Sequence, residues 1–194
     1  MKKALLFVTV LFMLGFTYKN YLKQTAIIIK PESNLIIKGK TNLNTFDCSF
    51  DVLNLKNPIP VFYTVEKGKM FFKETNLVLE NDCFDCDNKA MNKDFRELLK
   101  TGEHPKIYLR IKELENVNTD KATLMVHLNM EIAGITIPYK VPVKIEAEKE
   151  NLFVRGKLAV DICDFKLEPP KKLLGIIKVD NEIEVDFQLL LEEC

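Results

Sequence analysis

The stretch that decides the fold is residues 86–111, CDNKAMNKDFRELLKTGEHPKIYLRI. Phe95, Leu98 and Leu99 are spaced three and four residues apart, so they lie on one face of a helix predicted over residues 91–100. In the last six residues of the stretch, apolar and polar side chains alternate, which is typical of a strand. One amphipathic helix therefore leads directly into a strand.

The sequence also marks the two ends of this helix. Asn92 or Asp94 can cap its start, because a short polar side chain accepts hydrogen bonds from the free N–H groups of the first turn. Gly102 follows the last periodic residue and is a stop signal. Pro105 then prevents any continuation, because proline has no N–H to donate.

Most of the remaining chain alternates apolar and polar residues with a period of two, which predicts antiparallel strands with one buried and one wet face. The segments are 26–30, 35–46, 50–55, 70–80, 106–114, 124–132, 141–147, 152–162 and 183–191. Residues 57–60, NPIP, predict a loop. About eight strands joined by short turns favour a closed barrel, because closure removes the unpaired edges, and a sandwich is the alternative.

Composition limits the class of protein. The chain has 194 residues, which suits one domain, and 47% of them are apolar, which suits a packed interior. Lysine and arginine number 28, as do aspartate and glutamate, so the formal net charge is zero. This balance gives no general electrostatic attraction to nucleic acid, and no nucleic-acid partner is expected.

The N-terminus has the pattern of a targeting segment. Lys2 and Lys3 precede an apolar run over residues 4–16. This pattern predicts a signal peptide over residues 1–18, with an uncleaved N-terminal anchor as the alternative. The folded domain is expected over residues 26–194. The protein is therefore expected to be exported, either periplasmic or secreted, or tethered to the membrane by the N-terminal segment.

The residue types that carry chemistry are few. The cysteines are Cys48, Cys83, Cys86, Cys163 and Cys194. In an exported protein they are first of all candidates for disulfides, ahead of free buried thiols. Cys83 and Cys86 have the spacing of a zinc or redox pair, but no second pair with this spacing is present and no βαβ pattern surrounds them. His104 and His127 have no converging partners in the sequence, so we expect no catalytic residue, no metal, no cofactor and no enzymatic activity.

Three segments in order resemble the YceI-like family, and the resemblance extends over roughly residues 27–191. They are residues 35–48 (LIIKGKTNLNTFDC), 91–107 (MNKDFRELLKTGEHPKI) and 161–180 (DICDFKLEPPKKLLGIIKVD). The resemblance implies an all-β fold, an eight-stranded antiparallel lipocalin-like β-barrel with one inserted α-helix. It also implies export and the binding of a long apolar ligand, such as a polyisoprenoid or other lipid, inside the barrel.

With this resemblance, the inward-facing apolar residues become candidates for cavity lining, and the helix becomes a candidate lid over the entrance. The candidates are Phe95, Leu98, Leu99, Ile107, Leu109, Leu124, Val126, Leu128, Met130, Val143, Val154, Leu158, Val185 and Phe187. Arg96, Lys100 and Lys106 are candidates for contacts with a polar head group. A barrel filled by side chains, working as a structural or interaction module of the cell envelope, is the alternative. Membrane association through the N-terminus and a homodimer stay open.

The family-like segments also bear on the cysteines. Cys48 and Cys86 both lie next to them, which favours a Cys48–Cys86 disulfide between an early strand and the start of the helix. A bridge between Cys83 and Cys163 is the weaker alternative, and Cys194 is expected to be free.

Overall fold

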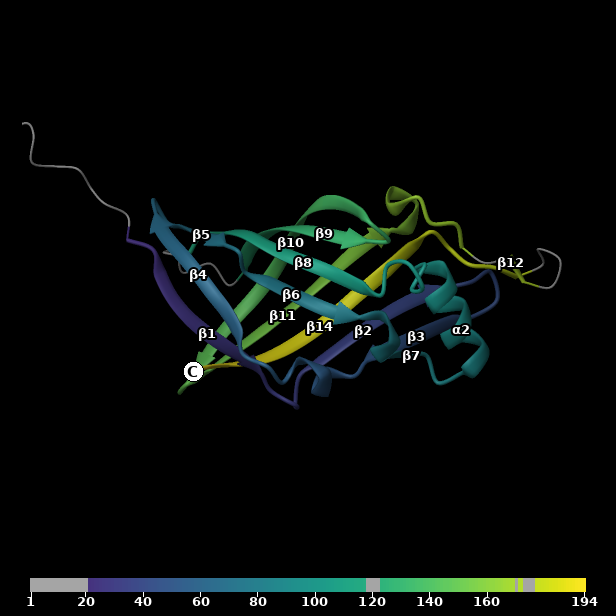
Figure 1. Ribbon diagram of the computed structural model, residues 1–194, viewed down its shortest axis with the longest axis horizontal. Coiled ribbons are helices and arrows are strands. Elements are labelled where there is room, and N and C mark those ends of the chain that lie inside the picture. Colours follow the sequence, from purple (N-terminus) through teal and green to yellow (C-terminus); the bar gives the residue numbers. More distant parts are fainter. Residues whose placement is uncertain (1–20, 118–122, 170, 173–176) are drawn as a thin grey trace, which may run out of the picture.

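The structure is a computed structural model, and it describes residues 21–117, 123–169, 171–172 and 177–194 (Figure 1). The segment predicted as a signal peptide or anchor, residues 1–18, lies outside the described residues. Within them, no helix has the length and apolar character needed to cross a membrane.

Eight antiparallel strands form a closed ring, which confirms the predicted all-β barrel class. In spatial order they are β1 (Lys23–Ile29), β4 (Ile59–Glu66), β5 (Lys69–Lys73), β8 (Lys106–Glu115), β9 (Leu124–Ile132), β10 (Ile135–Glu148), β11 (Asn151–Asp161) and β14 (Glu182–Glu193). The pairing of Ile27 with Glu193 and of Ile29 with Leu191 joins the last strand to the first. The closed ring explains the alternation of apolar and polar residues, because alternate residues of each strand face the inside and the outside of the barrel.

Tight turns fix the register of two hairpins. Ala133 and Gly134 join β9 to β10, and both have positive φ, 49° and 78°. Lys67 and Gly68 join β4 to β5 with φ of 49° and 77°. Two successive residues in this conformation are typical of a type I′ turn, whose twist matches that of the flanking strands.

Shorter elements extend the sheet away from the ring. They are β2 (Asn34–Lys40), β3 (Thr45–Phe50), β6 (Asn76–Glu80) and β7 (Phe84–Asp85), with the 3-10 helices η1 (Val52–Leu55), η2 (Asn81–Cys83) and η3 (Ile162–Phe165) and a separate pair, β12 (Lys171–Lys172) and β13 (Ile177–Lys178). The first half of β14 pairs with β2, and β2, β3 and β7 continue the sheet from there. β6 pairs only with β8. The 3-10 helix η2 connects β6 to β7.

The strand predicted over residues 70–80 is two strands. Glu74 has a φ of 58°, which breaks the extended chain between β5 and β6. Thr75 keeps the neighbouring strands bonded across the break: its hydroxyl accepts from the Phe62 N–H at 3.4 Å, and its carbonyl accepts from the Ile111 N–H at 3.0 Å. Both pieces still pair with β8.

Two further predictions in this half of the chain were wrong. The strand expected over residues 50–55 ends at Phe50, because the Asp51 carboxylate accepts from the Leu53 N–H at 3.1 Å and caps η1. The loop expected over residues 57–60 ends early, since β4 begins at Ile59. Pro60 has no N–H to donate, yet it lies within this strand.

The inserted helix α2 (Lys89–Leu98) begins earlier than predicted. Its cap is Asn88, whose side-chain oxygen accepts from the N–H groups of Ala90 and Met91 at 2.9 and 3.2 Å. Asn92, one of the predicted caps, instead accepts from the Cys86 N–H at 2.7 Å. Lys100 has a φ of 52°, and this left-handed residue follows the end of the helix.

The Cys48–Cys86 disulfide is present, and it ties β3 to the segment that leads into α2. Cys48 is fully buried. The Phe84 ring packs against the rings of both Phe50 and Phe95, at centroid distances of 4.9 and 5.2 Å. Cys83, Cys163 and Cys194 are free thiols, so the alternative bridge between Cys83 and Cys163 is absent. The α2 end of the barrel is thus a covalently pinned core.

Candidate functional site

The barrel encloses an elongated cavity of about 960 Å³. Apolar side chains from all eight ring strands line it, together with one residue from β2 and two from β6. On β14 the apolar lining residues run from Val185 to Leu191 at every second position, a length of about 20 Å at ~3.3 Å per residue. The volume is at the upper end of ligand pockets, which span about 300–1,000 Å³.

The interior is hollow toward one end and packed toward the other. On β11 the inward-facing residues change from Leu152, which is 40% exposed, to Val160, which is 1% exposed. On β9 the change runs the same way, from half-buried Leu124 and Val126 to buried Met130. Half-buried apolar residues inside a closed ring face empty space, so this barrel is not filled by its own side chains.

The open end is marked by polar residues. The polar lining residues at this end are Thr25, Lys149, Glu150, Asn151 and Glu193. They come from β1, the β10–β11 turn, the start of β11 and the end of β14, and the turn and the C-terminus lie at the same end of the barrel (Figure 1). The Thr25 hydroxyl donates to the Glu193 carboxylate at 2.5 Å across this rim. We call this end of the barrel the mouth. It combines an apolar interior with a few polar groups at the edge, which is typical of small-molecule binding sites.

Ten of the fourteen candidate residues lie on the cavity wall. They are Leu109, Leu124, Val126, Leu128, Met130, Val143, Val154, Leu158, Val185 and Phe187. Their contact with a ligand stays a prediction. Their shared position follows from strand geometry, since alternate residues of a strand face the same side of a sheet.

The four other candidates do not line the cavity, and α2 is not a lid over the mouth. Leu99 and Ile107 are buried in the core of the packed end, and Phe95 and Leu98 pack against that core. α2 lies at the opposite end of the barrel from the C-terminus, which is at the mouth (Figure 1). The helix is amphipathic because it covers the packed end.

The candidate head-group residues lie at that same packed end. Arg96 pairs with Asp82 at 3.7 Å, and Lys106 pairs with Glu80 at 2.9 Å. Lys100 follows Leu99, the residue that caps the end of the helix. All three are therefore remote from the polar rim of the cavity.

Sequence reasoning missed the lining residues of the first ring strands. Ile27 and Ile29 on β1, and Ile59, Val61 and Tyr63 on β4, all line the cavity. The signal was present in β4, where apolar residues alternate from Ile59 onward. It was obscured because the prolines of the NPIP segment indicate a loop more strongly than the alternation indicates a strand.

With this geometry established, comparison with known proteins identifies the family. The sequence pattern of the YceI-like domain matches residues 62–191. The chain belongs to the YceI-like family. A search of the curated proteins finds no match.

Solved structures share the fold of this YceI-like chain at low sequence identity. A polyisoprenoid-binding domain from Saccharophagus degradans, implicated in plant cell wall breakdown, has a TM-score of 0.62 at 14% identity, and the match covers 89% of this chain and 99% of that one. BcnA from Burkholderia cenocepacia has a TM-score of 0.60 at 15% identity, covering 82% and 96%. The YCEI protein of Campylobacter jejuni has a TM-score of 0.52 at 12% identity, covering 61% and 71%. At these identities the likeness establishes the fold.

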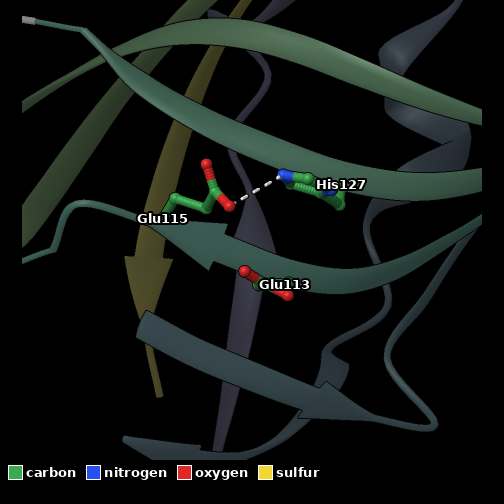
Figure 2. Close-up of side chains that lie close together, drawn as sticks. All are labelled: Glu113, Glu115 and His127. Atoms are coloured by element: carbon green, nitrogen blue, oxygen red, sulfur yellow. Dashed lines mark ion pairs between the residues drawn. The ribbon is translucent and has the colours of Figure 1, made fainter. Parts of the chain in front are cut away.

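The outer face of the YceI-like barrel carries one cluster that the sequence did not predict. Figure 2 shows Glu113 and Glu115 on β8 beside His127 on β9, whose Nε2 lies 3.4 Å from Glu115 Oε1. The expectation that His127 has no converging partner was therefore wrong. The two carboxylates share one lysine, because Lys69 Nζ lies 2.6 Å from Glu113 Oε1 and 2.9 Å from Glu115 Oε1.

This cluster is best described as a lysine-bridged ion pair. The ligand atoms of Glu113, Glu115 and His127 lie within 4.8 Å of one another, a donor set that suits a divalent cation. The Lys69 ammonium already bonds both carboxylates and would have to leave before a cation entered. Its hydrogen bond is the main cause that lowers the pKa of Glu115, against the opposing effect of burial.

The cysteine pair of the YceI-like chain does not have the features of a redox site. Cys86 is bonded to Cys48 rather than to Cys83. Burial, and then the negative charges of Glu80, Asp51 and Asp82, raise the pKa of the Cys83 thiol above its ordinary value. A raised thiol pKa disfavours the thiolate, which is the reactive form.

Proposed function

We propose that this YceI-like protein is an exported, non-enzymatic binding protein that holds a long apolar molecule, a polyisoprenoid or other lipid, inside its barrel. The observation that carries the proposal is the hollow, apolar cavity of about 960 Å³ that opens at a polar rim. Binding would come mainly from the apolar area removed from water, at ~25 cal/mol per Å².

Three features support this function over the alternatives. The half-buried inner residues disfavour a barrel filled by side chains, which is what a purely structural module would have. The polar groups that line the cavity lie mostly at its rim, whereas an enzyme needs them gathered around a reacting centre. The Saccharophagus degradans domain of the same fold is a polyisoprenoid-binding domain, and this agrees with the ligand class proposed here. Export is supported by the predicted signal peptide or anchor alone.

The test is to recover the full chain from gentle purification and to weigh it by native mass spectrometry. We expect a bound lipid, or uptake of an added long-chain polyprenol by protein that is recovered empty. Repeated recovery of empty protein that also takes up no polyprenol would refute the proposal.

A pair of variants locates the ligand. Val154→Trp places a large ring on the cavity wall, whereas Phe153→Trp alters the next residue, which faces the outside of the same strand. We expect Val154→Trp to lower the amount of bound lipid and Phe153→Trp to leave it unchanged. Equal loading of the two variants would place the ligand outside the cavity.

A further inference from the structure

Large apolar side chains on the surface gather around the mouth. Of the seven large exposed hydrophobic residues in the described part of the chain, five lie at this end: Tyr21, Leu22, Val65, Phe71 and Leu152. Tyr21 and Leu22 are 78% and 52% exposed, respectively. The other two, Leu43 and Leu53, lie in the turn after β2 and in η1. Clustered exposed apolar residues indicate a contact surface, whereas single ones do not.

Strand pairing and the positions of the turns place these residues at the same end of the barrel. Lys23 pairs with Tyr63, so Tyr21, two residues earlier, lies level with Val65, two residues later in the antiparallel partner. Phe71 is in β5, just after the β4–β5 turn, and Leu152 is in β11, just after the β10–β11 turn. Both turns, the start of the described chain and the C-terminus lie at the same end of the barrel, opposite α2 (Figure 1).

The sequence that precedes this edge suggests what covers it. The apolar run over residues 4–16 ends five residues before Tyr21. Five residues reach at most about 18 Å when fully extended. A membrane anchor in this run would therefore hold the mouth, and not the α2 end, next to the bilayer.

We propose that the mouth rim, formed by Tyr21, Leu22, Val65, Phe71 and Leu152, docks on the surface of a lipid bilayer. The cavity then opens toward the lipids, and an apolar molecule can pass between bilayer and barrel with little exposure to water. This inference rests on the proposed function for its purpose, but the docking itself does not require a ligand.

The charges of the mouth rim indicate which lipid head groups are needed for docking. Basic and acidic residues are mixed at this end: Lys23, Lys67 and Lys149 with Glu66, Glu148, Glu150 and Glu193. Because the two signs nearly cancel, docking depends on insertion of the apolar residues and does not need anionic head groups. Phosphatidylcholine vesicles are therefore the appropriate probe.

Two native thiols report the orientation. Cys194 lies at the mouth, where its N–H donates to the Ala26 carbonyl at 3.0 Å, and Cys163 lies in η3 at the other end of β11. Both are free and exposed. The full chain is labelled with a membrane-impermeant maleimide, in solution and on phosphatidylcholine vesicles, and the rate at each thiol is read by mass spectrometry. We expect labelling of Cys194 to slow several-fold on vesicles and labelling of Cys163 to stay the same.

A matched pair of variants separates the rim from the exposed apolar residues elsewhere on the barrel. Tyr21→Ser, Leu22→Ser and Phe71→Ser together remove rim residues that do not line the cavity, and Leu43→Ser with Leu53→Ser removes exposed apolar residues elsewhere. We expect each rim substitution to weaken vesicle binding about fivefold, because less apolar area is buried when the rim docks. In the triple variant, labelling of Cys194 on vesicles should return to the rate seen in solution. The control pair should behave as the wild type.

Protection of Cys163, equal labelling of Cys194 on and off vesicles, or equal loss of binding in the control pair would overturn the inference. Failure of the proposed function looks different: the protein would protect Cys194 on vesicles and yet take up no polyprenol.

Discussion

The ring of Phe187 lies over Gly156, its partner on the neighbouring strand, so closely that a Cβ atom at position 156 would be 2.5 Å from Phe187 Cζ. The same Cβ would be 3.0 Å from the carbonyl oxygen of Pro142. Gly156 occupies an inward-facing position of β11, and Phe187 lines the cavity. Because Gly156 has no side chain, the Phe187 ring can lie directly over it, and this contact determines the position of the ring on the cavity wall.

Gly156→Ala is expected to displace Phe187 toward the cavity. Overpacking of this kind costs about 1–3 kcal/mol, and the displaced ring reduces the space available for a ligand. We expect a lower free energy of unfolding in urea and less bound lipid by native mass spectrometry.

Gly102→Ala is the matched control, because a Cβ at Gly102 meets no atom within 4 Å. It should change neither the unfolding free energy nor lipid uptake appreciably. Unchanged lipid binding in Gly156→Ala would show that this part of the wall does not contact the ligand.

Many residues of the cavity wall could be predicted from the sequence. In a closed barrel, the alternation of apolar and polar residues along each strand decides which side chains face the interior. Alternation placed Val154, Val185 and Phe187 on the inner face, the family resemblance made them candidates for cavity lining, and all three line the cavity. The same argument failed at Ile59 and Val61, where neighbouring prolines conceal the strand.

The position of the mouth could not be predicted in this way. A period of two says which side of a sheet a residue faces, but not toward which end of the barrel the interior is hollow. The amphipathic helix suggested a lid, whereas its apolar face packs on the pinned core near Phe84 and Cys86. The cluster around His127 was missed for a related reason, because it depends on the register of three strands.

Removal of the Cys48–Cys86 disulfide is expected to destabilise the packed end. The bond joins residues 38 apart in sequence, and cross-links that close loops of this size stabilise proteins by about 2–4 kcal/mol. Replacing both cysteines with alanine should lower the urea midpoint accordingly, while the protein still takes up lipid. Cys194→Ser is the control and should leave the midpoint unchanged, because Cys194 is an exposed free thiol. An unaltered midpoint in the double variant would contradict the account of a pinned core.

The Lys69 cluster predicts a pH-dependent contribution to stability. The hydrogen bond from Lys69 depresses the pKa of Glu115 in the folded state, so the stabilisation is present above the unfolded value of about 4.3 and is lost as the pH falls through the lower folded value. Lys69→Met should therefore be less stable than the wild type at pH 7, and this difference should vanish in strongly acidic solution. Urea unfolding across this range measures it.

Lys67→Met is the control for that series, since Lys67 is exposed in the adjacent turn. Its stability should follow that of the wild type at every pH. A difference between wild type and Lys69→Met that persists at low pH would mean that the lysine acts through packing of its stem instead of its charge.

The α2 end is expected to matter for stability and not for passage of the ligand. Asn81 is 1% exposed, and its side-chain amide donates to the His104 carbonyl at 2.8 Å and to the Thr101 hydroxyl at 3.1 Å, which ties η2 to the loop between α2 and β8. Asn81→Ala leaves the buried carbonyl without this donor, a loss of about 1–3 kcal/mol. Urea unfolding should show this loss, whereas exposed Asn181→Ala should not. The rate of lipid transfer from vesicles should be unchanged in both variants, because the cavity opens at the other end. Faster transfer in Asn81→Ala alone would instead place a second entrance beside the helix.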